Sequence, residues 1–292
     1  MMATKRKVAK KKAGKKKAAE KTAAKKKAAK KTVSPRKRST SASTPVQVAE
    51  STEDVQRLLK VLCDTGKLIE VRMAALQSLG AAAFSVPNFE SVSADYIAAL
   101  RQVSTDSHEQ LRRRALGILM RNKDGFAQKK LLDGLKNPAK ALLPPEKALQ
   151  LLGNDAHAEA YSVARAIVKK PPNQDAKREA LRLLAADAKS APMFEKVLRN
   201  KKELRENRQL AASALHSLNP QKLQQQALKI LKDKSDYSDI KATSLTALEQ
   251  FGDDAKFAKD KALMLSVTRF NSSNTPAKYK QSARRFLSKY DQ

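Results

Sequence analysis

Apolar residues recur at helical spacing along most of this chain. From Ser51 onward, leucine and alanine return every three or four positions, and no stretch alternates apolar and polar residues as a half-buried strand would. This pattern predicts an all-α body. The preceding residues differ, because no large apolar residue occurs between residues 9 and 32. We therefore expect a disordered basic tail with a Ser/Thr/Pro linker at 1–50 and a helical domain at 51–292.

A short alanine–leucine phrase returns at near-constant intervals through the body. Its alanines are Ala75, Ala115, Ala148, Ala180, Ala214, Ala247 and Ala283. The spacings are 40, 33, 32, 34, 33 and 36 residues, which is typical of a solenoid of stacked helical pairs. The copies near Ala214 and Ala247 can be shifted by one helical turn, so their register stays open.

The apolar pattern predicts about seven helical pairs. First helices are expected at 52–63, 93–104, 125–136, 156–169, 192–199, 220–232 and 255–269. Second helices are expected at 68–80, 107–121, 145–153, 174–187, 204–218, 238–251 and 276–290.

Capping residues mark several of these helix ends. Glycines that are expected to adopt a left-handed conformation at helix ends are Gly80, Gly153 and Gly252. Asn219-Pro220 and Thr275-Pro276 each place a cap before a proline, as a helix start favours. Asp106 and Glu109 are expected to form a capping box.

Two segments resemble the second helix of a HEAT repeat. Residues 70–80 (EVRMAALQSLG) and 175–181 (DAKREAL) carry an acid, a small apolar residue, a base and an alanine in that family's order. The resemblance covers roughly 51–292 and implies a right-handed α-solenoid. The tetratricopeptide repeat is the main alternative, matched once by Leu152-Gly153, Ala158, Tyr161, Ala164 and Pro171.

Charge adds a constraint on partners. The chain carries a net charge of +31, and residues 1–45 contribute +17 of it through eighteen Lys or Arg and one acid, Glu20. The body therefore carries the remaining +14. An excess of this size points to polyanionic partners.

The tail resembles the lysine–alanine tails of linker histones and of bacterial histone-like proteins. Ser34-Pro35-Arg36-Lys37 is similar to the Ser-Pro-basic-basic turn that such proteins place in A·T-rich minor grooves. Candidate nucleic-acid contacts in the tail are Lys11, Lys12, Lys15, Lys16, Lys17, Lys25, Lys26, Lys27, Lys30, Lys31, Arg36, Lys37 and Arg38. Candidate phosphorylation sites beside them are Ser34, Ser39 and Thr44.

Lysine pairs also follow four consecutive first helices of the body. They are Lys136 and Lys140, Lys169 and Lys170, Lys201 and Lys202, and Lys232 and Lys234. Because turns at equivalent places in a solenoid share one edge, we expect a basic ridge there, with few acids among the lysines. Second-helix bases that are expected to face the same ligand are Arg112, Arg113, Arg114, Lys177, Arg178, Arg205 and Arg208.

No catalytic constellation is recognisable. His108, His157 and His216 lie in different repeats, and Cys63 is the only cysteine, which excludes an internal disulfide and a thiolate zinc cluster. Some HEAT-like proteins are DNA repair glycosylases, and resemblance to them would imply a tryptophan-lined pocket, but this chain has no tryptophan. The expectation is therefore that the chain is not an enzyme and needs no cofactor or metal.

These observations predict a nucleic-acid-associated binding or scaffold protein, with DNA favoured over RNA. The tail would anchor on phosphates, and a partner protein could occupy the solenoid groove. The alternative is a protein–protein scaffold whose tail, through Lys5-Arg6-Lys7 and Lys10–Lys12, only localises it. With no run of eighteen apolar residues, an intracellular location without a membrane is expected, in a nucleoid or nucleus.

Overall fold

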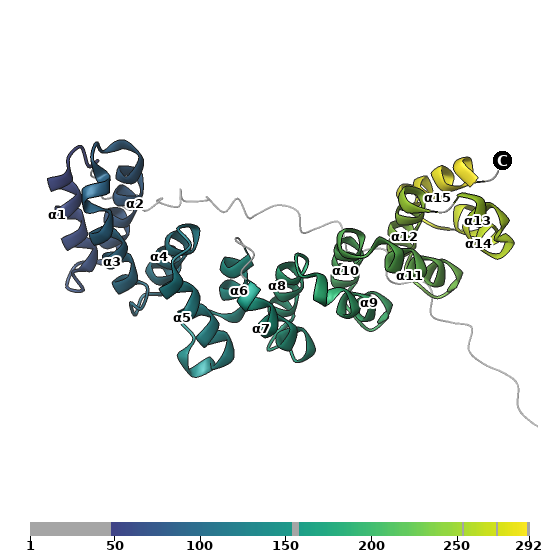
Figure 1. Ribbon diagram of the computed structural model, residues 1–292, viewed down its shortest axis with the longest axis horizontal. Coiled ribbons are helices and arrows are strands. Elements are labelled where there is room, and N and C mark those ends of the chain that lie inside the picture. The colour runs from purple at the N-terminus through teal and green to yellow at the C-terminus, as the bar shows by residue number, and fades with distance from the viewer. Residues whose placement is uncertain (1–47, 154–157, 253, 273, 291–292) are drawn as a thin grey trace, which may run out of the picture. The chain divides into compact units, whose positions relative to one another are not determined.

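The computed structural model describes residues 48–153, 158–252, 254–272 and 274–290. These ranges contain fifteen α-helices and three short 3-10 helices, and no strand is found in them. All of the helices lie within one compact unit, Thr44–Gln292 (Figure 1). The prediction of an all-α repeat fold is confirmed.

The helices alternate between first and second members of a pair. First helices are α1 (Thr52–Cys63), α3 (Ser93–Val103), α5 (Gly125–Lys136), α7 (Ala158–Lys169), α9 (Ala191–Arg199), α11 (Pro220–Lys232), and α13 (Asp254–Lys259) with α14 (Lys261–Ser272). Second helices are α2 (Ile69–Ser85), α4 (Glu109–Arg121), α6 (Pro145–Gly153), α8 (Gln174–Leu184), α10 (Arg205–Leu218), α12 (Ser238–Phe251) and α15 (Ala277–Tyr290). The 3-10 helices are η1 (Phe89–Val92), η2 (Pro138–Lys140) and η3 (Ala188–Ser190).

Three of the predicted helices depart from the expected bounds by three residues or more, and one of them, α8, ends at Leu184 instead of residue 187. The first helix of the seventh pair is broken at Asp260, whose Oδ1 accepts a hydrogen bond from the backbone N–H of Leu263 at 3.0 Å and caps α14. Helix α2 continues through Gly80 to Ser85. The left-handed prediction for glycine is wrong, since no glycine in the described ranges has a positive φ. Left-handed backbone occurs instead at Asn88 and Lys123, with φ of 58° and 55°.

One of the predicted helix caps is confirmed and another is wrong. The Asn219 side chain accepts from the N–H of Lys222 at 3.0 Å, which confirms the cap of α11. The predicted capping box is wrong, because α4 begins after His108, whose side chain makes no cap hydrogen bond. Asp106 instead pairs with Arg72 of the preceding repeat at 2.6 Å.

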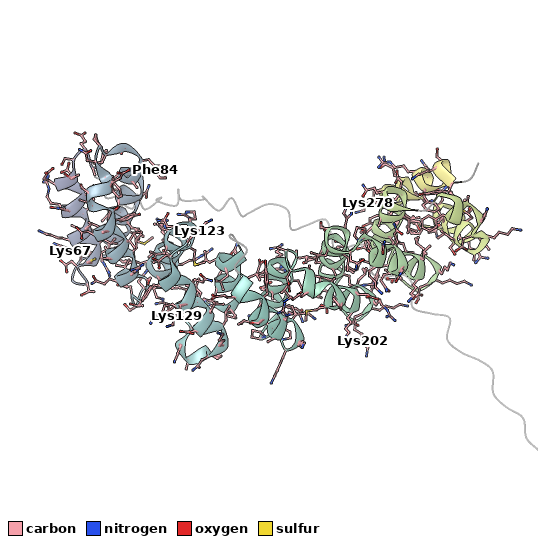
Figure 2. All side chains as sticks on the ribbon, in the orientation of Figure 1. Lys67, Phe84, Lys123, Lys129, Lys202 and Lys278 are labelled. Atoms are coloured by element: carbon pink, nitrogen blue, oxygen red, sulfur yellow. The ribbon has the colours of Figure 1, made fainter. Side chains whose placement is uncertain are left out.

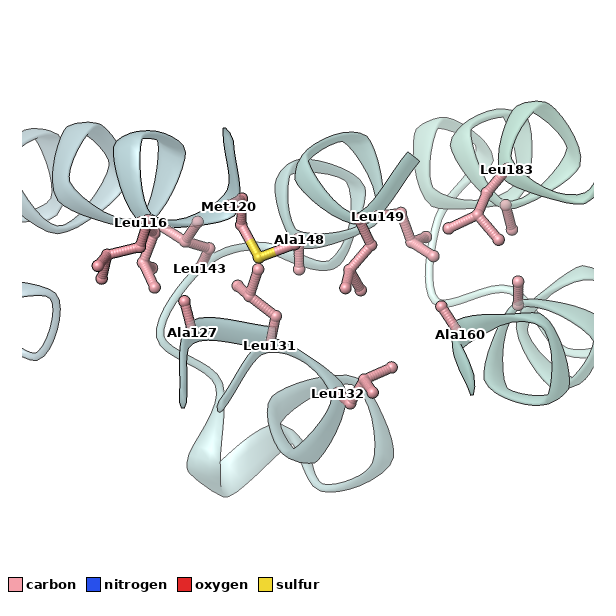
Figure 3. Packing of buried hydrophobic residues seen from close by; sticks show 14 of the residues in the cluster. Leu116, Met120, Ala127, Leu131, Leu132, Leu143, Ala148, Leu149, Ala160 and Leu183 are labelled. Carbon is pink, nitrogen blue, oxygen red and sulfur yellow. The ribbon is translucent and has the colours of Figure 1, made fainter. Parts of the chain in front are cut away.

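The core runs between the two layers of helices. Second helices α4, α6, α8, α10 and α12 follow one another in one layer, and α5, α7, α9 and α11 form the other (Figure 1). Buried leucine and alanine fill the space between them, as Met120, Leu131 and Ala148 show where α4, α5 and α6 meet (Figure 3). A second cluster, containing Phe286 and Tyr290 with ring centroids 4.5 Å apart, closes the C-terminal end.

Buried arginines tie successive repeats together. Arg72 in α2 donates through Nε to the Leu62 carbonyl at 2.9 Å and pairs with Asp106 in the turn of the next repeat. Arg208 in α10 donates through Nε to the Leu198 carbonyl at 2.8 Å. Both arginines reach a carbonyl ten residues earlier, at the end of the paired first helix.

This equivalence settles one of the two registers that the sequence left open, that of α10. Ala75 lies three residues after Arg72, and the residue three after Arg208 is Ala211, which is fully buried. The repeat alanine of α10 is therefore Ala211, one helical turn before Ala214. In α2 and α10 the buried arginine, and not the alanine–leucine phrase, therefore aligns the two repeats.

Candidate functional site

The four lysine-bearing turns each connect a first helix to its second helix, as predicted. They follow α5, α7, α9 and α11, and all eight of their lysines are exposed to solvent. Figure 2 shows the side chain of Lys202 extending from the turn after α9. We call the surface formed by these turns the lysine edge.

Contacts between consecutive turns show that the later part of this edge is continuous. Lys201 forms an ion pair with Asp233 and donates to Ser235 Oγ at 2.7 Å, so the turn after α9 touches the turn after α11. Lys232 pairs with Asp260 at 2.8 Å in the same way, reaching the start of α14. The turns after α9 and α11 thus lie side by side.

Both carboxylates are held in the charged form. The hydrogen bond from Lys201, with further bonds from Ser235, lowers the pKa of Asp233 from 3.8 to about 2. The Lys232 hydrogen bond and the backbone N–H of Leu263 lower the pKa of Asp260. The expectation that acids are nearly absent from this edge is therefore wrong. The carboxylates of Asp233 and Asp260 neutralise Lys201 and Lys232. These two lysines are therefore less available to a nucleic acid.

The remaining edge lysines keep their charge uncompensated. Their ammonium groups make no ion pair or hydrogen bond with any residue that the structure describes. These residues are Lys136, Lys140, Lys169, Lys170, Lys202 and Lys234.

Most of the second-helix bases are engaged by the protein itself. Arg208 is fully buried. Arg112 donates to the Leu142 carbonyl at 3.0 Å and to the Asp106 carbonyl at 2.7 Å. Lys177 pairs with Glu203. The expectation that these three face a ligand is wrong, because they bind carbonyls and carboxylates of the repeat stack.

Two further bases have local partners. Arg178 lies between Asp175 and Glu206, and Arg205 is positioned over the ring of Tyr237, 4.6 Å from its centroid. Of the predicted set, only Arg113 and Arg114 are exposed and make no ion pair, hydrogen bond or ring contact with a described residue.

Arg113 and Arg114 line a groove of about 610 Å³ over α2, α4 and α6. Arg121, Gln77 and Gln110 also line it. Arg121 was not among the bases expected from the sequence, although Gln110, Arg114 and Arg121 follow one stripe of α4 at helical spacing. Guanidinium groups present planar donors that match phosphate or carboxylate oxygens. We call this surface the arginine groove.

The described residues contain little that resembles a metal centre. No three His, Cys, Asp or Glu side chains of the described ranges gather where they could hold a metal ion. Cys63 is a free thiol whose pKa is raised by burial, with Arg72 opposing the shift. No described helix has both the length and the apolar character needed to cross a bilayer.

The tail candidates lie outside the described residues. They are Lys11, Lys12, Lys15, Lys16, Lys17, Lys25, Lys26, Lys27, Lys30, Lys31, Arg36, Lys37 and Arg38, with Ser34, Ser39, Thr44 and the internal His157. Their contribution to binding stays a prediction.

The chain has structural likeness to solved proteins. No family model matches the chain, and no curated protein matches it. The structure of human deoxyhypusine hydroxylase in complex with glycerol aligns over 82% of this chain and 96% of that chain, with 15% identity and a TM-score of 0.35. A likeness of this degree assigns no activity or substrate to this chain.

One expectation is corrected by that match. The chain was expected not to be an enzyme because catalytic motifs are unrecognisable in its sequence, yet the matched helical protein is itself an enzyme. The expectation that the chain is not an enzyme is therefore withdrawn.

Proposed function

We propose that the protein binds nucleic acid through its phosphate backbone, using the lysine edge of the helical domain together with the basic tail. The observation that carries this proposal is the set of six exposed edge lysines without ionic partners among the described residues, on turns of which those after α9 and α11 contact each other. A lysine that binds a phosphate releases counterions and makes no contact with the bases. Binding would therefore be independent of nucleotide sequence and would depend on salt.

The arginine groove supports the same ligand class. Arg113, Arg114 and Arg121 converge on a surface lined also by glutamine amides, which donate to phosphate oxygens as well. Guanidinium groups that lack a carboxylate partner repel other cations placed close to them, and this repulsion costs free energy unless a bound anion compensates it. The groove therefore suits a polyanion of repeating phosphates.

DNA is the favoured ligand over RNA in this proposal, on the tail's resemblance to histone-like tails. Lysine contacts alone do not distinguish the two, because the 2′-hydroxyl is what separates RNA from DNA at a protein surface. A location in a nucleoid or nucleus follows from the proposal and is proposed with it.

Fluorescence anisotropy of a labelled DNA duplex tests the proposal with the full chain and with a chain that lacks residues 1–45. All described helices lie within Thr44–Gln292, so the deletion removes none of them. We expect both proteins to bind, the shorter one more weakly, with affinity falling steeply as salt rises. A full chain that fails to bind duplex DNA or RNA at low salt contradicts the proposal.

A further inference from the structure

A second pocket lies between the first helices α7 and α9, beside the turns that follow them. Its volume is about 410 Å³, within the range of ligand-sized clefts. Residues of α7, of the start of α8, of η3 and of α9 line it, so it is built from two successive repeats. The arginine groove lies on other helices and shares no lining residue with it.

Cations surround this pocket in excess of the acids. Arg165 is paired with Asp187, and Lys177 is paired with Glu203. Three more cations at the rim are exposed and make no ion pair with any described residue; they are Lys169, Lys189 and Lys196. The rim therefore presents three uncompensated positive charges.

The floor of the same pocket is apolar. Pro192 is exposed and Met193 is half-buried, and Val168 and Val197 lie buried in the lining. Pro192 stands in the first turn of α9, where its ring fixes the backbone. Methionine adapts its shape to different apolar partners. The pocket can therefore hold a ligand through apolar contacts as well as through charge.

We propose that this pocket binds an acidic peptide segment of a partner protein. One large apolar side chain of the segment rests on Pro192 and Met193, and its carboxylates pair with Lys169, Lys189 and Lys196. The apolar floor favours a peptide over a nucleic acid, because a phosphate backbone has no group that gains from contact with proline and methionine.

The basic tail of this chain does not supply this ligand. Residues 1–45 hold eighteen Lys or Arg and a single acid, so the rim lysines repel them. The occupant is therefore another protein, whose acidic segment complements the net charge of this one.

Anisotropy of a fluorescein-labelled peptide of repeated Glu-Glu-Leu-Glu units tests the proposal on the full chain. Two probes control for its parts: the same peptide with serine in place of leucine, and a short DNA duplex. The variants are K189E/K196E, which reverses the rim, and Met193→Ser, which removes apolar surface from a half-buried side chain. K222E/K229E on the exposed face of α11 is the matched charge control.

We expect the leucine peptide to bind wild type, with Kd raised about tenfold by K189E/K196E and unchanged by K222E/K229E. Met193→Ser should raise Kd about fivefold for the leucine peptide and leave the serine peptide unaffected. Equal binding of the two peptides, or equal weakening by both charge reversals, overturns the proposal. So does duplex DNA that displaces the leucine peptide and loses affinity with K189E/K196E but not with Met193→Ser.

Discussion

Arg208 and Asp236 form a buried, two-pronged ion pair between adjacent repeats. Nη1 and Nη2 of Arg208 each donate to one carboxylate oxygen at 2.7 Å. The two side chains are 0% and 3% exposed, so the pair is withdrawn from water. A third bond, from Nε to the Leu198 carbonyl, anchors the guanidinium to its own repeat. The arginine thus connects α9, α10 and the turn before α12.

Removing one member of this pair should be strongly destabilising. Asp236→Ala leaves the guanidinium buried without a counter-charge, and we expect a loss of about 3–5 kcal/mol in the free energy of unfolding. Lys201→Gln breaks an ion pair that is half exposed and should cost no more than about 1 kcal/mol. Urea denaturation followed by circular dichroism measures both. Equal effects of the two substitutions would contradict the structural role of Arg208.

Acid should weaken the contact between the turns after α9 and α11. The pKa of Asp233 is lowered from 3.8 to about 2, chiefly by the hydrogen bond from Lys201. Because the folded-state pKa is depressed, its stabilisation is complete above pH 3.8 and is lost as pH falls toward 2. Asp233→Asn should flatten this part of the stability profile, measured as the urea midpoint against pH. An unchanged profile would show that the ion pair contributes nothing.

Alanine at two helical glycines should act in opposite directions. Gly80 lies inside α2 with open space around an added Cβ, so Gly80→Ala should stabilise by about 0.5–1 kcal/mol through helix propensity. At Gly134 the added Cβ would lie 2.8 Å from Ala141 Cα, and Gly134→Ala should destabilise by about 1–3 kcal/mol. Thermal melts of both variants check the difference. A stabilising Gly134→Ala would contradict the packing of α5 against the turn that carries Lys140.

The arginine groove should contribute to nucleic-acid affinity. R113Q/R114Q removes two unpaired guanidinium groups, and the slope of log K against log salt should fall in magnitude by about 2. R178Q/R205Q removes the same charge from bases that already have partners in the protein. We expect the control to change the slope less. Identical slopes for the two variants would mean that the groove contacts no phosphate.

Local pattern predicted the helices well, because each pair buries its apolar stripe against its neighbours. The bounds of α1, α5, α6, α11 and α12 match the expected ranges. Gly80 misled the prediction because propensity marks a helix end, whereas packing of Leu79 and Ala82 in the core carries α2 onward.

Partners distant in the sequence account for what the pattern missed. The pairing of Lys201 with Asp233, 32 residues later, depends on how turns of adjacent repeats meet. From the sequence, Asp106 is predicted to cap a helix of its own repeat. In the structure its carboxylate instead binds Arg72 of the previous repeat, 34 residues earlier. The same stacking hides Arg208 from solvent. Repeat spacing could have indicated these pairs, had the arginine been taken as the repeat marker.

Salt-dependent DNA binding tests the role of the lysine edge most directly. The chain lacking residues 1–45 removes the tail's contribution, and K136Q/K140Q/K169Q/K170Q then neutralises four exposed edge lysines that have no ionic partner among the described residues. K60Q/K129Q/K222Q/K229Q removes equal charge from exposed positions on the first helices α1, α5 and α11.

For the edge variant, we expect the slope of log K against log salt to fall in magnitude by about 3, with helical content unchanged. The control should retain most of the wild-type slope, because Lys129 and Lys222 lie near the starts of their helices and Lys60 and Lys229 lie about one helical turn before the connecting turns. An edge variant that binds duplex DNA with the same affinity and slope as the control would contradict the account.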